Sequence, residues 1–157
     1  MQSGRVGIIP RPRGGDWLDD EARAWRGAGI DVVVSLLTPE EISEFQLEDE
    51  GRYCRAEGIQ FLSFPIPDRG APPSRQAAVA LVDKLVKMLE SGKNVAIHCR
   101  QGIGRSALIA ASLLVSLGGS ADDAFRAVGK ARGCAVPDTM DQRIWVDELA
   151  VDGLLSK

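Results

Sequence analysis

Cysteine is scarce in this chain, with three among 157 residues, and no two of them are separated by only two positions. This spacing excludes a zinc site built from C-x-x-C pairs. The odd number of widely spaced cysteines also argues against a disulfide framework. We therefore interpret Cys54, Cys99 and Cys134 as reduced thiols and expect a cytoplasmic protein.

Long hydrophobic runs are also missing. No apolar stretch reaches the roughly 18 residues needed to span a bilayer, and the Gly-, Arg- and Pro-rich start lacks the apolar core of a signal peptide. Neither charge sign dominates, because 19 basic residues face 22 acidic ones for a net charge of −3. This balance argues against bulk electrostatic binding to nucleic acid or a membrane. We expect a monomer.

Short β-branched runs alternate with helical patterns through the first two-thirds of the chain, and helices fill the rest. The pattern predicts an α/β fold with a small, mostly parallel central sheet flanked by helices in three layers. Length and composition indicate a single domain over residues 1–157. The predicted strands cover 6–9, 30–37, 59–64 and 94–97. The predicted helices cover 17–28, 39–50, 52–57, 74–90, 106–117, 120–132 and a last segment from 138.

The chemistry is concentrated between His98 and Ser106, where a strand, a glycine-bearing turn and a helix follow one another. Such a turn directs backbone N–H groups inward, and the helix N-terminus adds partial positive charge. Cys99 lies in this anion cradle, which favours its thiolate at neutral pH. Arg105 stands where the helix begins, and its planar fork suits two oxygens of a phosphoryl group. A nucleophile and an oxyanion clamp around one cradle indicate covalent phosphoryl transfer.

The run His98-Cys99-x-x-Gly102-x-x-Arg105-Ser106 resembles the H-C-x-x-G-x-x-R-[S/T] signature of the cysteine-dependent protein tyrosine phosphatases. The short chain is similar to the compact dual-specificity branch, including its bacterial members. The resemblance implies that Cys99 forms a cysteinyl-phosphate, Arg105 holds the phosphoryl oxygens and Ser106 donates a hydrogen bond to the sulfur. It further implies that His98 orients the loop. The implied phosphate-binding loop comprises Arg100, Gln101, Gly102, Ile103, Gly104 and Arg105.

A general acid must protonate the leaving oxygen. The resemblance implies an Asp on a separate loop upstream, and Asp68, in a proline-rich loop after a predicted strand, matches it. The same carboxylate then serves as base for the attacking water. Gln142, near the start of the last helix, is either the glutamine that positions this water in some branches or a surface residue. The implied mechanism uses no metal and no cofactor, and the implied partner is a phosphorylated protein or a small phosphoester.

The surroundings of the motif bear on specificity. The family often has Gly after the Ser or Thr of the signature, where this chain has Ala107. A helix accepts Ala at least as well. No counterpart of the tyrosine-recognition loop of the larger enzymes is recognisable, which implies a shallow pocket open to phosphoserine and phosphothreonine as well as phosphotyrosine. Arg11, Arg13 and Arg69 either flank the pocket mouth or are solvated loop charges.

Three other functions remain open at this point. One is a phosphoinositide or RNA 5′-phosphatase of the same superfamily, although the phosphate loop carries only Arg100 as a basic residue before Arg105. The second is a binding module that captures phosphorylated partners without turnover, although the nucleophile, clamp and acid are all present. The third is a rhodanese-like sulfur carrier, which the spacing from cysteine to arginine disfavours. Cys54 or Cys134 is a further candidate as a resolving thiol for an oxidised Cys99.

Overall fold

A four-stranded sheet, with every strand parallel to its neighbours, forms the centre of the molecule in the computed structural model, which describes residues 3–100, 104–132 and 139–152. The strand order is β1-β4-β2-β3. The strands are β1 (Val6–Ile8), β2 (Val32–Ser35), β3 (Gln60–Ser63) and β4 (Val95–His98). Every residue of β2 and β4 is buried, as expected for strands covered on both faces. The predicted α/β fold is confirmed.

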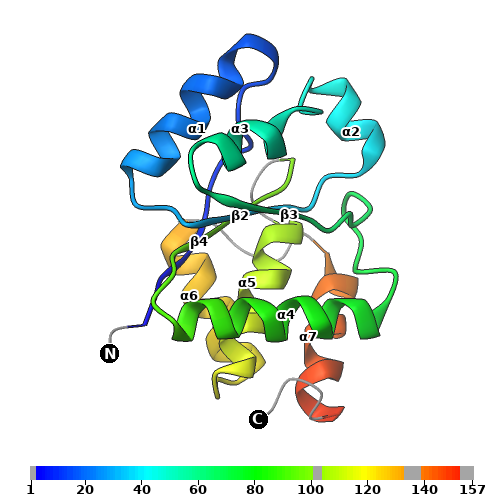
Figure 1. The fold of residues 1–157 in the computed structure, drawn as a ribbon. Helices are drawn as coiled ribbons and strands as arrows, with labels where there is room; N and C mark the ends of the chain where they lie inside the picture. Colours follow the sequence, from blue (N-terminus) through cyan, green and yellow to red (C-terminus); the bar gives the residue numbers. More distant parts are fainter. Residues whose placement is uncertain (1–2, 101–103, 133–138, 153–157) are drawn as a thin grey trace.

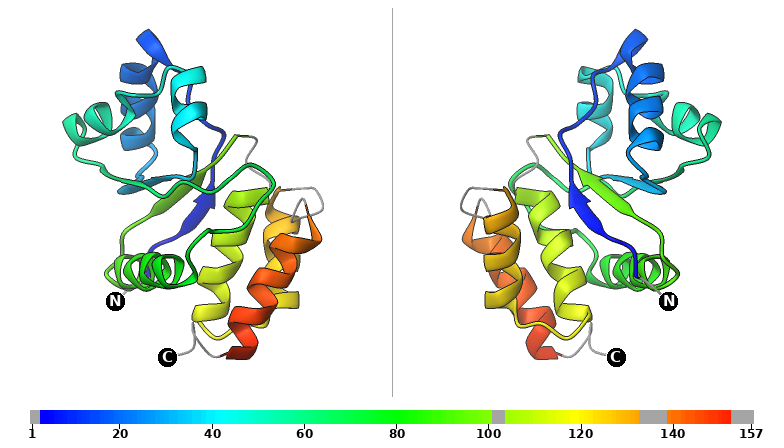
Figure 2. Two further views of the ribbon diagram at one scale, coloured as in Figure 1. Left: turned by 90° about the vertical axis from the view of Figure 1, so that its right-hand side faces the viewer. Right: turned by 90° about the vertical axis from the view of Figure 1, so that its left-hand side faces the viewer.

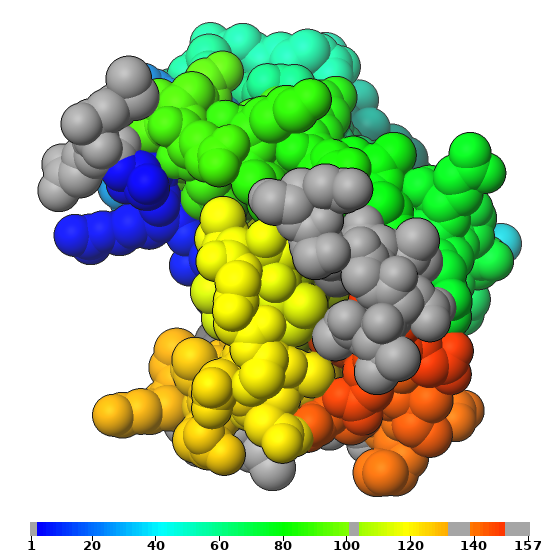
Figure 3. Space-filling view, turned by 90° about the horizontal axis from the view of Figure 1, so that it is seen from below, coloured from blue at the N-terminus to red at the C-terminus, as the bar shows by residue number. Residues whose placement is uncertain are grey.

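Helices cover both faces of the sheet (Figures 1 and 2). One layer contains α1 (Leu18–Gly27), preceded by a 3₁₀ turn, with α2 (Pro39–Glu44) and α3 (Glu50–Ala56). The other contains α4 (Arg75–Glu90), α5 (Gly104–Ser116), α6 (Ala121–Arg132) and α7 (Met140–Asp152). Figure 3 shows this second layer from its outer side. Among the described residues, no helix combines the length and apolarity that a bilayer crossing demands.

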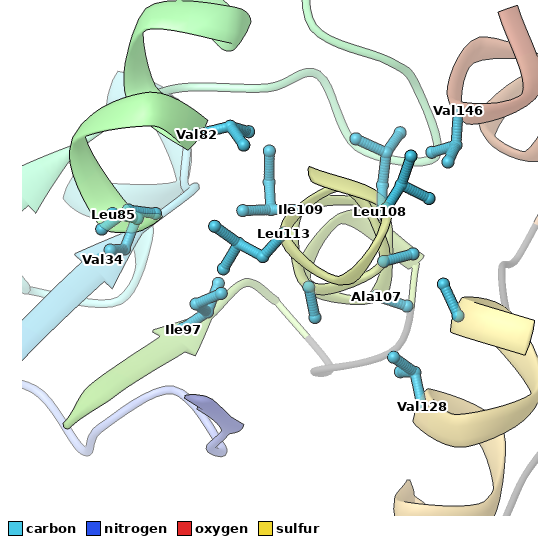
Figure 4. Close-up of a cluster of buried hydrophobic side chains, with 14 of the residues drawn as sticks. Val34, Val82, Leu85, Ile97, Ala107, Leu108, Ile109, Leu113, Val128 and Val146 are labelled. Carbon is cyan, nitrogen blue, oxygen red and sulfur yellow. The ribbon is translucent and has the colours of Figure 1, made fainter. Parts of the chain in front are cut away.

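Helix α5 is the centre of the larger core and also carries the signature arginine. Eleven of its thirteen residues are buried, because α5 packs between the sheet and its neighbouring helices. Figure 4 shows side chains from every side converging on this helix. They include Val34 and Ile97 from the sheet, Val82 and Leu85 from α4, Val128 from α6 and Val146 from α7. This packing fixes the helix at the end of the phosphate loop.

Two helices begin with residue types that favour the N-cap position, Thr38 and Ser74, and both side chains form the cap that their type predicts. The Thr38 side chain accepts a hydrogen bond from the Glu41 N–H, and the Glu41 carboxylate accepts one from the Thr38 N–H, which completes the capping box of α2. The Ser74 side chain accepts a hydrogen bond from the Ala77 N–H at the start of α4. Local sequence therefore determines where these two helices begin.

Two predictions about the first helical layer are wrong. The single helix predicted over 39–50 ends at Glu44, because Gln46 adopts a left-handed φ of 56° and α3 begins only at Glu50. The turn between them lets Leu47 enter a small core with Leu18 and Leu37. Trp17 is a large aromatic residue at the start of a predicted helix, which predicts a place in the core, but it is 52% exposed and the Arg13 guanidinium stacks on its ring.

Candidate active site

The carboxyl ends of all four parallel strands meet at one edge of the sheet, where sites of such folds form. Each predicted active-site segment follows one of these ends. Cys99 follows β4, Asp68 lies in the loop after β3, and Arg11 lies in the loop after β1. The segment after β2 leads into α2 and contributes Glu41. Residues far apart in the sequence are therefore gathered around the cysteine by the topology.

Cys99 lies directly after the buried strand β4 and is 3% exposed. Helix α5 begins at Gly104, two residues earlier than predicted, so Gly104 and Arg105 both lie in its first turn. Arg100 donates hydrogen bonds to both carboxylate oxygens of Glu44, each at 3.3 Å. The predicted loop residues Gln101, Gly102 and Ile103 lie outside the described residues.

Arg105 is 2% exposed and its guanidinium is held from several sides. Its two terminal nitrogens donate to the two Glu41 carboxylate oxygens at 2.7 and 2.9 Å, and one of them also donates to the Ile66 carbonyl at 2.9 Å. Burial alone lowers the pKa of Arg105, but the hydrogen bonds to Glu41 and the charges of Cys99, Glu41 and Asp68 raise it above its ordinary value. The clamp therefore stays charged and keeps one orientation.

Glu41 is a site residue that sequence reasoning missed, because its role as the capping-box glutamate of α2 already accounted for it. The same carboxylate that caps the helix also binds Arg105. Burial raises the pKa of Glu41, but the Arg105 and Thr38 hydrogen bonds outweigh burial and lower the pKa below its ordinary value. Its signal in the sequence is the position of the capping box directly after a buried strand, at the edge where parallel sheets place ligands.

Asp68, the predicted general acid, lies in the loop after β3 and close to Arg105. It occupies a turn closed by the Gly70 N–H donating to the Pro67 carbonyl at 2.9 Å, with Arg69 in the left-handed region at φ 61°. Its carboxylate is half-exposed and lies 3.2 Å from a terminal nitrogen of Arg105. A half-exposed carboxylate beside the oxyanion clamp can reach a leaving oxygen held there.

Gln142 is fully buried in the first turn of α7, so it is not a surface helix residue. Its side-chain N–H donates to the Gly70 carbonyl at 3.0 Å, and its side-chain oxygen accepts from the Thr139 N–H. The Thr139 hydroxyl donates to the Arg69 carbonyl at 3.4 Å. These bonds tie the Asp68 turn to α7, so Gln142 supports the segment that carries the predicted acid.

The two signature residues beside the nucleophile and the clamp are buried as well. His98 is fully buried, and its Nε2 lies 2.6 Å from a Glu50 carboxylate oxygen. Ser106 is fully buried, and its hydroxyl has no hydrogen-bond partner among residues 3–100, 104–132 and 139–152. The described part of the fold therefore does not use this hydroxyl. The sequence predicted both positions, but Glu50 had no recognisable signal because it lies in an ordinary helix start.

The flanking arginines differ from one another. Arg13 pairs with Glu21 at 3.0 Å, whereas the Arg11 guanidinium stacks 3.6 Å from the centre of the Phe45 ring. Arg100 approaches the same ring at 4.9 Å, which places Arg11 beside the start of the phosphate loop. Arg69 contributes its carbonyl to the Thr139 contact.

Cys54 is not a recognisable partner for Cys99. Burial and the nearby Glu50 charge raise the pKa of the Cys54 thiol to about 12, which leaves this thiol unreactive. Cys54 packs in a separate small core with Val33 and Ile59. Cys134 lies outside the described residues.

The chain is similar to known phosphatases in sequence. A family described as "Polymorphic toxin system, DSP-PTPase phosphatase" matches residues 7–119. Cyclin-dependent kinase inhibitor 3 of Rattus norvegicus is 29% identical over 125 residues, which cover 78% of this chain and 58% of that protein. Protein tyrosine phosphatase type IVA 2 of Mus musculus is 32% identical over 108 residues, 59% of this chain and 62% of that protein. The chain thus spans about three-fifths of the length of these curated relatives.

Solved structures agree with the sequence matches. Tk-PTP in its active form is 31% identical, with a TM-score of 0.76 over 94% of this chain and 92% of that chain. The kinase-associated phosphatase, solved with its catalytic cysteine replaced by serine, has a TM-score of 0.83 at 22% identity, over 94% and 86% of the two chains. Together with the arrangement around Cys99 and Arg105, these matches show that the chain belongs to the DSP-PTPase family, the dual-specificity branch of the cysteine-dependent protein tyrosine phosphatases.

Proposed function

We propose that this chain hydrolyses phosphomonoesters on phosphorylated proteins, acting on phosphotyrosine and on phosphoserine and phosphothreonine through a cysteinyl-phosphate. One observation carries the proposal: the Arg105 guanidinium is held by Glu41 and lies 3.2 Å from Asp68, at the helix start that follows Cys99. Clamp, acid and nucleophile thus meet at one edge of the sheet. Residues from Arg11 to Gln142 surround this edge, which supports one catalytic domain over 1–157, acting as a monomer.

The reaction has two steps that share these groups. In the first, the Cys99 thiolate attacks phosphorus, the bond to the leaving oxygen breaks, and Asp68 gives that oxygen its proton. In the second, Asp68 takes a proton from water, whose oxygen attacks phosphorus and displaces the sulfur. Arg105 binds two phosphoryl oxygens in both transition states, and the Ser106 hydroxyl donates to the departing thiolate. Gln142 holds the Asp68 turn throughout.

The direct test is hydrolysis of phenyl phosphate and phosphotyrosyl, phosphoseryl and phosphothreonyl peptides near pH 6 with EDTA present. We expect the reduced protein to turn over all four, with EDTA leaving the rate unchanged, because Arg105 and the loop N–H groups stabilise the charge. Phosphopeptide binding without turnover would instead establish a binding module. Faster hydrolysis of a short-chain phosphoinositide than of any peptide would establish the lipid phosphatase.

Asp68→Asn should lower kcat by about 10²- to 10³-fold on phenyl phosphate, because the leaving phenolate then departs without its proton. The loss should shrink markedly on p-nitrophenyl phosphate, whose leaving group is stable as an anion. Steady-state kinetics on both esters measure this contrast. Asp83→Asn, on the exposed face of α4, is the matched control and should behave as the parent. Equal losses on the two esters would contradict an acid role for Asp68.

Arg11 gives the site a preference for acidic residues next to the phosphorylated one. Its guanidinium lies on Phe45 beside Arg100 and has no ion-pair partner among the described residues. Arg11→Ala should therefore raise KM about fivefold for a phosphopeptide with flanking Glu, the equivalent of about 1 kcal/mol. KM for p-nitrophenyl phosphate should stay unchanged.

Arg13→Ala is the matched control for Arg11, because Arg13 already pairs with Glu21. This variant should leave both KM values within twofold of those of the parent, about what a surface contact contributes. A KM increase for Arg11→Ala of the same size on a phosphopeptide without acidic neighbours would show that Arg11 only supports the loop. The preference for acidic flanks would then be abandoned.

A further inference from the structure

Glu50 is a buried carboxylate to which the reaction above gives no role. It begins α3, is 1% exposed and lies 2.6 Å from Nε2 of His98, the residue before the nucleophile. Within the described part of the chain, His98 is its one ion-pair partner. A buried carboxylate is costly unless a positive charge or strong hydrogen bonds compensate it. The pairing therefore places a charge-compensating contact directly behind the phosphate loop.

His98 depends on Glu50 for its orientation. The ring stacks on Trp25 with 6.4 Å between centroids, and its other nitrogen, Nδ1, is buried with no hydrogen-bond partner among the described residues. Glu50 is thus the one polar anchor of the ring in that part of the chain. Because Nε2 is the ring nitrogen remote from the backbone, the carboxylate lies at the far end of the imidazole from the strand that leads into Cys99.

Several described residues around this pair carry no charge, or have a charge that lies at the surface. Cys54, one turn along α3 from Glu50, is a neutral thiol because its pKa is raised to about 12. Ser35, the register partner of His98 on β2, is buried and uncharged, and Trp25 of α1 does not titrate. Arg55 interacts electrostatically with Cys54 but is exposed. A carboxylate with these neighbours depends on its contact with His98 for compensation of its burial.

We propose that Glu50 is a positioning residue that holds His98 as an imidazolium, with the positive end of the pair facing the Cys99 loop. The inference deepens the proposed function, because it assigns the source of one charge that favours the thiolate. The positive charges of Arg105 and Arg100 are partly compensated by the carboxylates of Glu41 and Glu44, to which they are hydrogen-bonded. In the His98 pair, by contrast, the carboxylate is at the remote end, so the cation is the nearer charge to the nucleophile.

The test is the pH dependence of Cys99 alkylation by iodoacetate, followed by mass spectrometry of the peptide that contains Cys99. Glu50→Gln keeps the size of the side chain and removes its charge, so the imidazole loses its proton and the thiolate loses a neighbouring cation. We expect the pH of half-maximal alkylation to rise by about one unit, so that alkylation at acidic pH slows about tenfold. Glu48→Gln, an exposed glutamate two residues away, is the matched control and should not shift it.

A double variant tests the route through His98. In a His98→Gln background, Glu50→Gln should produce no further shift, because the residue through which Glu50 acts is gone. A shift of the same size in both backgrounds would overturn the route through His98, and an unchanged midpoint in Glu50→Gln alone would overturn the proposal. Alkylation needs no substrate, so this result is independent of whether the chain turns over phosphoesters.

The unmodified protein offers a second measurement that does not depend on whether Glu50→Gln folds. His98 is the one histidine of the chain, so its ¹⁵N resonances need no assignment. We expect both ring nitrogens to carry protons at pH 7. A neutral ring at that pH would overturn the proposal even if the alkylation data could not be collected.

Discussion

Cys99→Ser should lower kcat by at least about 10⁴-fold while leaving phosphate binding intact, the largest effect expected for any substitution in this chain. A serine hydroxyl is a much weaker nucleophile than the thiolate that the proposed first step requires. Arg105 remains bound to Glu41, so the clamp survives the change. The measurements are steady-state kinetics on phenyl phosphate and calorimetric binding of a phosphopeptide.

Cys54→Ser is the matched control for this substitution. Cys54 is buried in a separate core, and its raised pKa keeps the thiol out of the chemistry. Its kcat per folded molecule should equal that of the parent, whatever stability it loses. Acid quenching during turnover should trap phosphate on Cys99 in the parent and none in Cys99→Ser. Turnover by Cys99→Ser within tenfold of the parent would refute the cysteinyl-phosphate route.

Arg105→Lys should lower kcat/KM by about 10³-fold, the second-largest expected effect. The guanidinium makes two parallel hydrogen bonds to Glu41 and still presents N–H groups toward Asp68 and the phosphate position. An ammonium group is a point charge and cannot keep this fork geometry. Steady-state kinetics on phenyl phosphate measure the loss, and competition by inorganic phosphate shows how much of it is binding.

Arg100→Lys is the matched control, because Arg100 lies in the same loop but is more than one-third exposed and pairs with the exposed Glu44. Its kcat/KM on phenyl phosphate should stay within about threefold of the parent, as for other exposed ion pairs. Glu41→Gln should reproduce part of the Arg105→Lys loss, because the amide supports the fork with one acceptor in place of two. If Arg105→Lys retained a tenth of the parental kcat/KM, bidentate positioning would not be the function of this residue.

Local patterns were sufficient wherever one segment carries its own structural signal. The β-branched run around Val32–Ser35, the Thr38 capping box and the Ser74 cap predicted a buried strand and two helix starts that the structure contains. Prediction failed after Glu44, where helical pattern continues but the chain turns at Gln46 so that Leu47 reaches a core. Burial of one side chain there outweighs a helix propensity worth a few tenths of a kcal/mol.

The predicted site residues also fall into two groups, those that a local motif identifies and those that only the fold brings to the site. Cys99, Arg105 and Ser106 are recognisable in the sequence because all three belong to one contiguous motif, the predicted phosphate loop. Asp68 was inferred from the resemblance, and the structure places its carboxylate beside Arg105. The sequence left two roles open for Gln142, a glutamine that positions water or a surface residue of the helix. The structure shows that Gln142 is buried and bonded to the Gly70 carbonyl, so it supports the Asp68 turn.

By itself the sequence determined the fold class, the phosphate loop and the residue types needed for thiol-based phosphoryl transfer. Only the tertiary structure shows which carboxylates contact the predicted site residues. In the sequence Glu41 is recognisable only as a capping-box glutamate, and Glu50, at the start of an ordinary helix, is not distinguishable from the other glutamates of the chain. The parallel sheet brings the first to Arg105 and the second to His98, across 64 and 48 positions of sequence. Ion pairs of this kind depend on side chains meeting in space, for which no local pattern exists.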